Sequence, residues 1–254
     1  MNQTWNAEKY SSDFSFVHQY GNDVIGLIEG KNVRSVLDLG CGNGALTRTL
    51  ADGGLAVTGM DASGEMLEKA KQNAPHLPFI QADATDFTLD ASVDVVFSNA
   101  VLHWINKEKQ PSMMRCVYRS LNDNGQFVFE MGGLGNNVLI HSALADVFQE
   151  HGYAYQMPFY FPSIGEYSTL LEAAGFKVRY AILFDRPTPI KGDNGLAGWI
   201  KMFLSNPFSV VAGSDRDGII SEAVQRLEKE LFKDGVWYLD YVRLRMRAVK
   251  EVAA

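Results

Sequence analysis

The first half of the chain alternates between short apolar runs and segments with apolar residues at helical spacing. The apolar runs predict buried strands at residues 34–39, 56–60, 77–81, 93–99 and 126–131. Helical spacing predicts helices at 14–30, ending at Gly30, at 45–51, after the capping residue Ser63, and at 112–121. Such alternation with short connections is typical of a parallel sheet with helices on both faces.

The second half is less regular. It predicts helices at 137–150, 164–174 and 219–232, and strands at 177–184 and 236–246. Residues 186–214 mix proline and glycine with large aromatic residues, which favours loops. We interpret residues 1–254 as one domain, with 1–30 as an N-terminal helical cover. Residues 186–235 are then a helical insertion over the carboxyl edge of the sheet, where ligands bind in such folds, as a lid or as a cover of the core.

A glycine-rich segment follows the first strand and opens the next helix, with the sequence Gly40-Cys41-Gly42-Asn43-Gly44. Its glycines permit positive φ and let a ligand approach the backbone closely. Its backbone N–H groups and the helix N-terminus are expected to converge on one point. The alternative is that these glycines only form a tight turn. Asp38 ends the preceding strand, where a buried carboxylate needs a cationic or donor-rich partner.

Two features predict an adenosine-type site without deciding the cofactor. The spacing Gly40-x-Gly42-x-x-Ala45 nearly fits the dinucleotide fingerprint, and Asp61 ends the second strand, where it can bind a ribose diol. Both an NAD(P)-dependent oxidoreductase and an S-adenosylmethionine-dependent enzyme satisfy them. Asp38 favours the second, because it suits an ammonium group better than a pyrophosphate. Asp83, which can accept from an adenine amino group, and the polar end of the strand at 94–99 favour it too.

With these residues the sequence resembles the class I S-adenosylmethionine-dependent methyltransferases, well over residues 34–131 and loosely elsewhere. Their glycine motif resembles residues 36–44 and their fourth-strand motif resembles 94–104. The resemblance implies an α/β fold with a Rossmann-like seven-stranded sheet of order 3-2-1-4-5-7-6, the last strand antiparallel. It implies S-adenosyl-L-methionine as the cofactor, bound by Asp38, Gly40, Cys41, Gly42, Asn43, Gly44, Asp61, Ala62, Met66, Asp83, Ala84 and Asn99.

Two further segments, Trp5-Asn6-Ala7-x-x-Tyr10 and Asn99-Ala-Val-Leu-His103-Trp104, resemble the small-molecule branch that includes trans-aconitate methyltransferases. That branch often carries an arginine in the helix before the first strand, to help bind a carboxylate, and residues 16–20 contain none. The expected reaction is methyl transfer to a small-molecule acceptor by in-line displacement. A carboxylate is one acceptor that needs no base. The remaining alternative is a non-catalytic protein that binds S-adenosylmethionine.

His103 and Tyr10 are the candidate catalytic residues, with helix capping or packing and an N-terminal aromatic anchor as their structural alternatives. Five aromatic residues are candidates for an acceptor pocket or for the core, namely Phe161, Trp199, Trp237, Tyr238 and Tyr241. Arg243, Arg245 and Arg247 share one face of the last predicted strand. We interpret this face as solvated, with a clamp for an anionic substrate as the alternative.

The composition of the chain limits which classes of binding partner are expected. The chain has 23 Lys and Arg against 30 Asp and Glu, a formal charge of −7, which argues against non-specific nucleic-acid binding. It shows no signal-peptide pattern and no apolar stretch near the roughly 18 residues of a spanning helix, so we expect a cytoplasmic protein that does not bind membranes. Cys41, Cys116 and the histidines show no metal-ligand spacing, so no metal is expected. The expected oligomeric state is monomer or homodimer.

Overall fold

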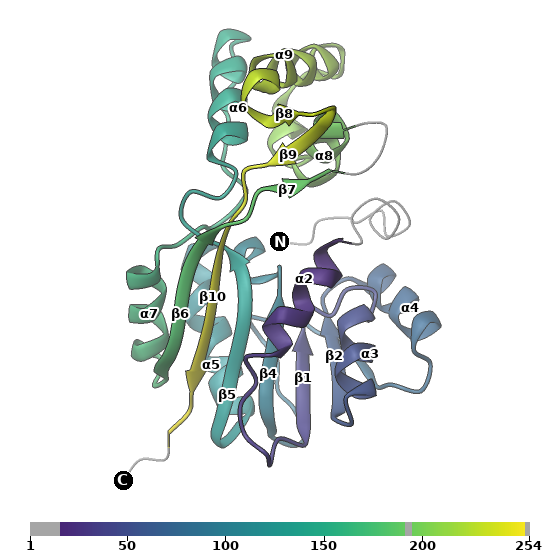
Figure 1. The fold of residues 1–254 in the computed structure, drawn as a ribbon, viewed down its shortest axis with the longest axis vertical. Helices are drawn as coiled ribbons and strands as arrows, with labels where there is room; N and C mark the ends of the chain where they lie inside the picture. The colour runs from purple at the N-terminus through teal and green to yellow at the C-terminus, as the bar shows by residue number, and fades with distance from the viewer. Residues whose placement is uncertain (1–15, 191–194, 252–254) are drawn as a thin grey trace.

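The structure is a computed structural model that describes the backbone of residues 16–190 and 195–251, with side chains from Gly21 onward. One sheet runs through β3 (Phe79–Gln81), β2 (Ala56–Asp61), β1 (Ser35–Leu39), β4 (Val93–Asn99), β5 (Leu121–Gly132), β10 (Val242–Val249) and β6 (Lys177–Asp185) (Figure 1). Strand β10 is antiparallel to both of its neighbours, whereas the pairs from β3 to β5 are parallel. The predicted strand order and the antiparallel last strand are confirmed.

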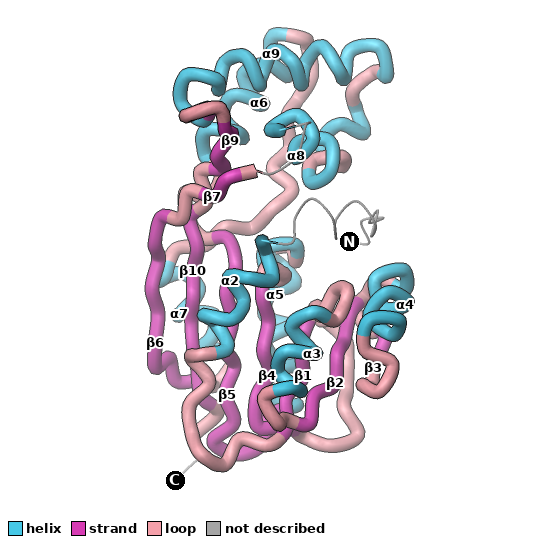
Figure 2. The backbone as a smooth tube through the Cα atoms, turned by 45° about the vertical axis from the view of Figure 1, so that its right-hand side comes forward, coloured by secondary structure: helices cyan, strands magenta, loops and turns pink. Residues whose placement is uncertain are grey.

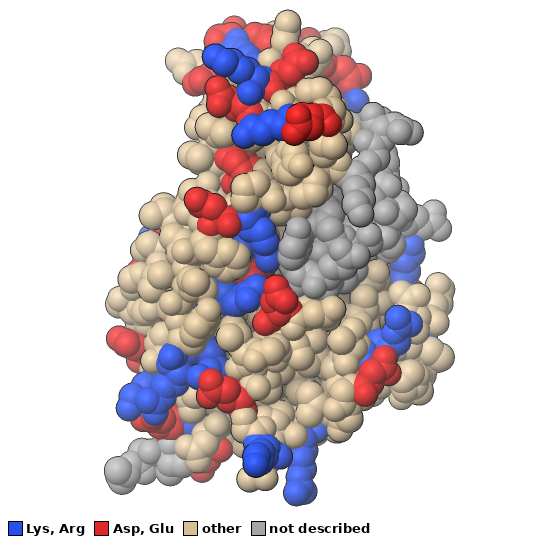
Figure 3. All heavy atoms as spheres, viewed as in Figure 1, with Lys and Arg blue, Asp and Glu red and all other residues tan. Residues whose placement is uncertain are grey.

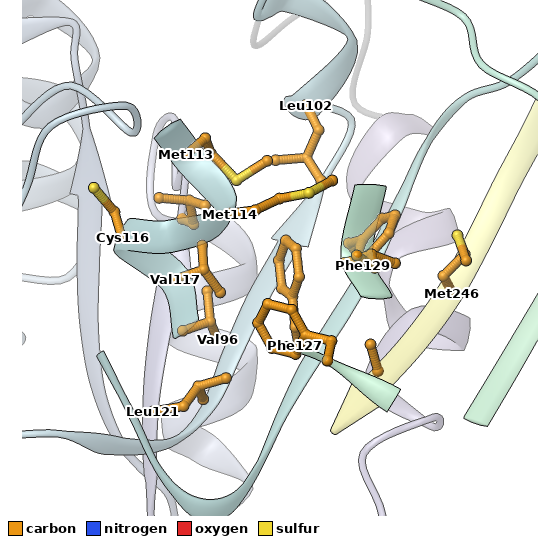
Figure 4. Close-up of a cluster of buried hydrophobic side chains, with 14 of the residues drawn as sticks. Val96, Leu102, Met113, Met114, Cys116, Val117, Leu121, Phe127, Phe129 and Met246 are labelled. Atoms are coloured by element: carbon orange, nitrogen blue, oxygen red, sulfur yellow. The ribbon is translucent and has the colours of Figure 1, made fainter. Parts of the chain in front are cut away.

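Helices pack on both faces of this sheet, as expected for parallel strands joined by crossovers. One face carries α2 (Phe16–Ile25) and α3 (Ala45–Asp52), the other carries α5 (Gln110–Ser120) and α7 (Ile164–Ala173), and α4 (Gly64–Asn73) lies beside β2 and β3. Figure 4 shows Met114 and Val117 of α5 in the same cluster as Phe127 and Phe129 of β5. Helix α4 begins at the predicted cap, Ser63, whose Oγ accepts the N–H of Met66. An apolar core on each face of the sheet holds the strands in place, and so determines where the strand ends lie.

A second group of elements, which we call the cap, stands beyond the carboxyl ends of β4 and β5 (Figures 1 and 2). It consists of α6 (Val138–Glu150), β7 (Thr188–Pro189), α8 (Gly195–Phe203), the 3-10 helix η3 (Pro207–Val210), α9 (Gly213–Leu231), β8 (Phe232–Lys233) and β9 (Val236–Leu239). Its apolar core gathers Phe148 of α6, Trp199 of α8 and Leu227 of α9 in one cluster of buried side chains. The cap is therefore built from two segments of the chain, the connection after β5 and the connection between β6 and β10.

Three local predictions were wrong. The predicted strand 236–246 is two strands, because the chain leaves the cap at Asp240 and Tyr241 and only β10 joins the main sheet. Helix α8 occupies part of the predicted loop 186–214, and α9 begins at Gly213, six residues before the predicted start. The buried spacing of α8, at Leu196, Trp199, Ile200 and Phe203, is helical and was outweighed by the nearby glycines and prolines.

The surface of the cap carries interspersed acidic and basic side chains (Figure 3). Arg226 of α9 pairs with Glu150 of α6 and with Glu222 of α9, and so links the two helices. These side chains are partly exposed to solvent, which screens the attraction, so the pairs add little to stability. None of the helices among the described residues is long and apolar enough to cross a membrane.

Candidate active site

A cavity of about 250 Å³ lies between the carboxyl ends of the first strands and the cap. It is the place where an open α/β sheet is expected to bind its ligand. The predicted site residues that line it are Asp38, Gly40, Cys41, Gly42, Asp61, Ala62, Met66, Asp83, Ala84, Asn99 and His103. The predicted residues Asn43 and Gly44 do not line it, and Tyr10 lies outside the described residues. Asn43 accepts the N–H of Ala45 through Oδ1, so both residues help to form the turn and the start of α3.

The sequence predicted that the N–H groups of the glycine turn converge on one point, where a ligand could accept from them. In the structure these groups are instead occupied by acceptors of the protein itself. The N–H groups of Gly40 and Cys41 donate to the carbonyl of Met60, at 2.7 and 3.0 Å. Gly42 donates to Asp61 Oδ2 at 2.9 Å, and Gly44 donates to the carbonyl of Cys41. A pyrophosphate needs free N–H groups at this point, so the turn is unsuited to a dinucleotide.

Gly40 shows why this turn requires glycine. Its φ is +76°, and a Cβ there would lie 2.3 Å from Cγ2 of Val101, which itself lines the cavity. The backbone at the end of β1 is therefore packed directly against the loop after β4.

Asp38 is almost completely buried at the end of β1 and lines the cavity. Its Oδ2 accepts a hydrogen bond from Thr47 Oγ1 of α3 at 2.6 Å. Burial, with a smaller repulsion from Asp61, raises the pKa of Asp38 to about 7. A cationic ligand group beside such a carboxylate stabilises its charged form.

Asp61 and Asp83 border the same half of the cavity. Asp61 accepts the N–H groups of Gly42 and Ser63, both at 2.9 Å, and burial raises its pKa. Asp83 is more exposed. It accepts the N–H and the hydroxyl of Thr85, and the first of these bonds is the main reason that its pKa is lowered. The structure thus brings together the three carboxylates that the sequence singled out.

His103 lies in the short 3-10 helix η1 (Leu102–Trp104), at the side of the cavity that faces the cap. Its Nδ1 accepts the N–H of Gly132 at 3.2 Å. Burial, with a contribution from Arg243, holds the pKa of His103 well below its usual value, so the ring is neutral at pH 7. Because Nδ1 is an acceptor, Nε2 carries the proton, and His103 offers a donor to its surroundings.

The alternating arginines of β10 do not face solvent, so the solvated face was a wrong interpretation. Arg243 and Arg245 donate to the buried carboxylate of Glu130 on β5, and Arg186, just after β6, donates to the same group at 2.6 Å. Arg247 is also largely buried and pairs with Glu29. Three guanidinium groups therefore surround one carboxylate. Sequence alternation identified the shared face, but it carried no information about what covers that face.

Arg186 and Arg243 both line the cavity, on the side of the cap. Of the predicted aromatic residues, Phe161, Trp199 and Tyr241 line it as well, whereas Trp237 and Tyr238 do not. The cavity accordingly has two electrically different halves. The half at β1 and β2 carries Asp38 and Asp61, and the half at the cap carries the excess positive charge of the arginine cluster.

The sequence analysis missed two asparagines that line the cap half, Asn136 and Asn137. Asn136 Oδ1 accepts the N–H of Val242, and Asn137 precedes α6 in a left-handed conformation with φ of +54°. The Oδ1 of Asn137 is buried without a hydrogen-bond partner among the described residues. A signal was present, because both residues follow the end of a predicted strand, the position that had singled out Asp61 and Asp83.

Comparisons with known proteins agree with this geometry. A family of methyltransferase domains matches residues 36–125. An uncharacterised methyltransferase of Schizosaccharomyces pombe is 34% identical over 97% of this chain and 98% of its own length. A trans-aconitate 2-methyltransferase of Rhizobium etli is 24% identical over 97% of this chain and 99% of its own.

Two solved structures share the fold. One is a methyltransferase of Haemonchus contortus in complex with S-adenosylhomocysteine, with a TM-score of 0.57, 18% identity, and coverage of 96% of this chain and 59% of that one. The other is an S-adenosylmethionine-dependent methyltransferase of Mesorhizobium loti, with a TM-score of 0.53, 17% identity, and coverage of 90% and 96%. The alternative of an NAD(P)-dependent oxidoreductase is set aside by these matches and by the occupied N–H groups of the turn. The chain belongs to the class I S-adenosylmethionine-dependent methyltransferases.

Proposed function

We propose that this enzyme transfers a methyl group by in-line displacement to a small anionic acceptor, with a carboxylate oxygen as the nucleophile. The observation that carries the proposal is the polarity of the cavity, acidic at β1 and β2 and basic at the cap. The names of several relatives, trans-aconitate 2-methyltransferases, point to the same acceptor chemistry.

The acidic half suits the cofactor. S-adenosylmethionine, when bound, supplies a methyl group that its sulfonium already activates. Asp38 is the proposed partner of the ammonium group and Asp61 of the ribose hydroxyls, because both carboxylates are buried and no cationic side chain that the structure describes pairs with either of them. Asp83 is the proposed acceptor for the adenine amino group. The remaining proposed contacts come from the predicted residues that line this half, namely Gly40, Cys41, Gly42, Ala62, Met66, Ala84 and Asn99.

The basic half suits the acceptor. Arg186, Arg243 and Arg245 hold three positive charges against the single negative charge of Glu130. Two of these guanidinium groups line the cavity, and the surrounding aromatic wall keeps the local dielectric low. An anionic group there is attracted, and a cationic or neutral acceptor gains nothing from the same charges.

His103 supports a nucleophile that needs no deprotonation. With Nδ1 occupied by the Gly132 N–H, the ring has no free basic nitrogen to accept a proton from a hydroxyl or an amine. We therefore propose that His103 is a hydrogen-bond donor in the site, in place of the predicted general base. A carboxylate is ionised at pH 7 and can react without a base, so positioning suffices for catalysis.

The test uses S-adenosylmethionine with an isotopically labelled methyl group and trans-aconitate as the first probe. The expected result is release of S-adenosylhomocysteine and a labelled methyl ester, with no product from the neutral trimethyl ester of trans-aconitate. Arg243→Gln is expected to lower kcat/KM for the carboxylate, while Arg247→Gln, outside the cavity, serves as the matched control. A wild-type enzyme that methylates amines or phenols in preference to every carboxylate offered would refute the proposal.

A further inference from the structure

Tyr241 lies where the chain passes from the cap strand β9 into β10, and its ring lines the basic half of the cavity. Its hydroxyl oxygen accepts a hydrogen bond from Nε1 of Trp199, at 3.2 Å. Trp199 belongs to α8 and is 2% exposed, packed in the apolar core of the cap. This hydrogen bond joins Tyr241 to Trp199, a residue that belongs to the core of the cap and also lines the cavity.

The direction of the Tyr241 proton follows from the chemistry of this pair. An indole N–H can only donate, so the phenol oxygen must accept from Trp199, and its own O–H must point in another direction. Burial raises the pKa of Tyr241, so the phenol keeps its proton at neutral pH. Among the described residues, no group accepts that O–H.

The guanidinium carbon of Arg243 lies 5.4 Å from the centre of the Tyr241 ring. Arg243 and the proton-bearing Nε2 of His103 are donors as well. Tyr241, Arg243 and His103 thus present donors to this wall, beside one acceptor, the Oδ1 of Asn137, and a ligand group with several lone pairs and a negative charge fits the three donors best.

We infer that Tyr241 is a specificity-determining residue that donates its O–H to the anionic group of the acceptor. Trp199 is the positioning residue that aims this O–H, because its own N–H occupies the other side of the phenol oxygen. The inference rests on the proposed function and deepens it, since it assigns acceptor recognition to a donor that the cap holds in place.

The test compares Tyr241→Phe, Trp199→Phe and the double variant, with trans-aconitate as the probe. Tyr238→Phe and Trp237→Phe are matched controls, because neither residue lines the cavity. Tyr241→Phe is expected to lower kcat/KM for the probe roughly 10- to 100-fold, mainly through KM, as for the loss of one hydrogen bond to a charged group. Binding of S-adenosylhomocysteine, measured by calorimetry, should stay within about twofold of the wild type in all variants.

The double variant separates orientation from packing. If Trp199 acts only by aiming the hydroxyl, Trp199→Phe lowers kcat/KM in the wild-type background and adds almost nothing once Tyr241 is phenylalanine. Additive losses would overturn the role of Trp199, and unchanged kcat/KM in Tyr241→Phe would overturn the role of Tyr241. Either result leaves the proposed function standing. Failure of the wild type to methylate any carboxylate would overturn both the proposed function and this inference.

Discussion

Asp38→Asn should make the ligand-free enzyme more stable at pH 8 while it weakens cofactor binding. Asp38 is 2% exposed, and within the described part of the chain its side chain accepts one hydrogen bond, from the hydroxyl of Thr47. In the unfolded chain this group ionises freely in water. Folding at high pH therefore transfers an ionised carboxylate into a buried environment that disfavours its charge. Asparagine keeps the shape and can still accept from Thr47, but it carries no charge.

The magnitude follows from the pKa of Asp38, which burial raises from 3.8 to about 7. Each tenfold difference in proton affinity between the folded and unfolded states corresponds to 1.36 kcal/mol, so ionised Asp38 costs the folded state up to about 4 kcal/mol. The native carboxyl holds its proton more tightly than the unfolded one. Its destabilising effect is therefore absent below pH 3.8, grows as the pH rises to about 7, and is constant above that value. At pH 5 it amounts to about 1.7 kcal/mol.

The assay is urea denaturation of the wild type and Asp38→Asn at pH 5 and pH 8. The variant should gain about 4 kcal/mol at pH 8 and about half of that or less at pH 5. Asp94→Asn is the matched control with the opposite sign, because hydrogen bonds from Arg34, Ser35 and Asn122 lower the pKa of Asp94 and stabilise its charge. If Asp38→Asn were no more stable than the wild type at pH 8, or if its gain did not shrink at pH 5, the reasoning would be refuted.

Three variants and one NMR measurement test other parts of the site. Asp61→Ala should weaken binding of S-adenosylhomocysteine at least about tenfold by calorimetry, and unchanged affinity would contradict the ribose assignment. Glu130→Gln should lower the free energy of unfolding by about 3–5 kcal/mol, since it leaves buried guanidinium groups without a counter-charge; a loss below about 1 kcal/mol would count against the cluster. Gly40→Ala should destabilise the protein in thermal unfolding, and Val101→Ala added to it should recover only part of the loss, because the positive φ remains strained. His103 should show the Nε2–H tautomer by NMR and no titration between pH 5.5 and 8, and an inflection near 6.5 would exclude the buried neutral ring.

The sheet and the acidic half of the site could be predicted from sequence because both depend on local patterns. Buried parallel strands are short apolar runs, and their carboxyl ends meet at one edge of the sheet. Residues that follow those runs, such as Asp38, Asp61 and Asp83, therefore come together whatever the rest of the chain does. Asn136 and Asn137 obey the same rule and were within reach of the same reasoning.

The cap was harder to predict, because its core joins two segments that are far apart in the sequence. Helix α6 packs on α9 and shares an apolar core with α8, so no single segment shows where the cap begins. The break between β9 and β10 did leave a local signal, since Val236–Leu239 is a continuous apolar run and the alternation with arginine begins only after Asp240.

The sequence by itself determined the class of fold, the turn after β1 and the carboxylates that suit an adenosine-type cofactor, because each is a property of neighbouring residues. Only the tertiary structure decided what the polar groups of the other half do. Arg243 became part of a positively charged wall because Glu130, more than one hundred positions away, neutralises just one of three guanidinium charges. His103 became a donor because the N–H of Gly132 occupies its other nitrogen. Charge and proton position in a buried site depend on partners that the fold brings from distant parts of the chain.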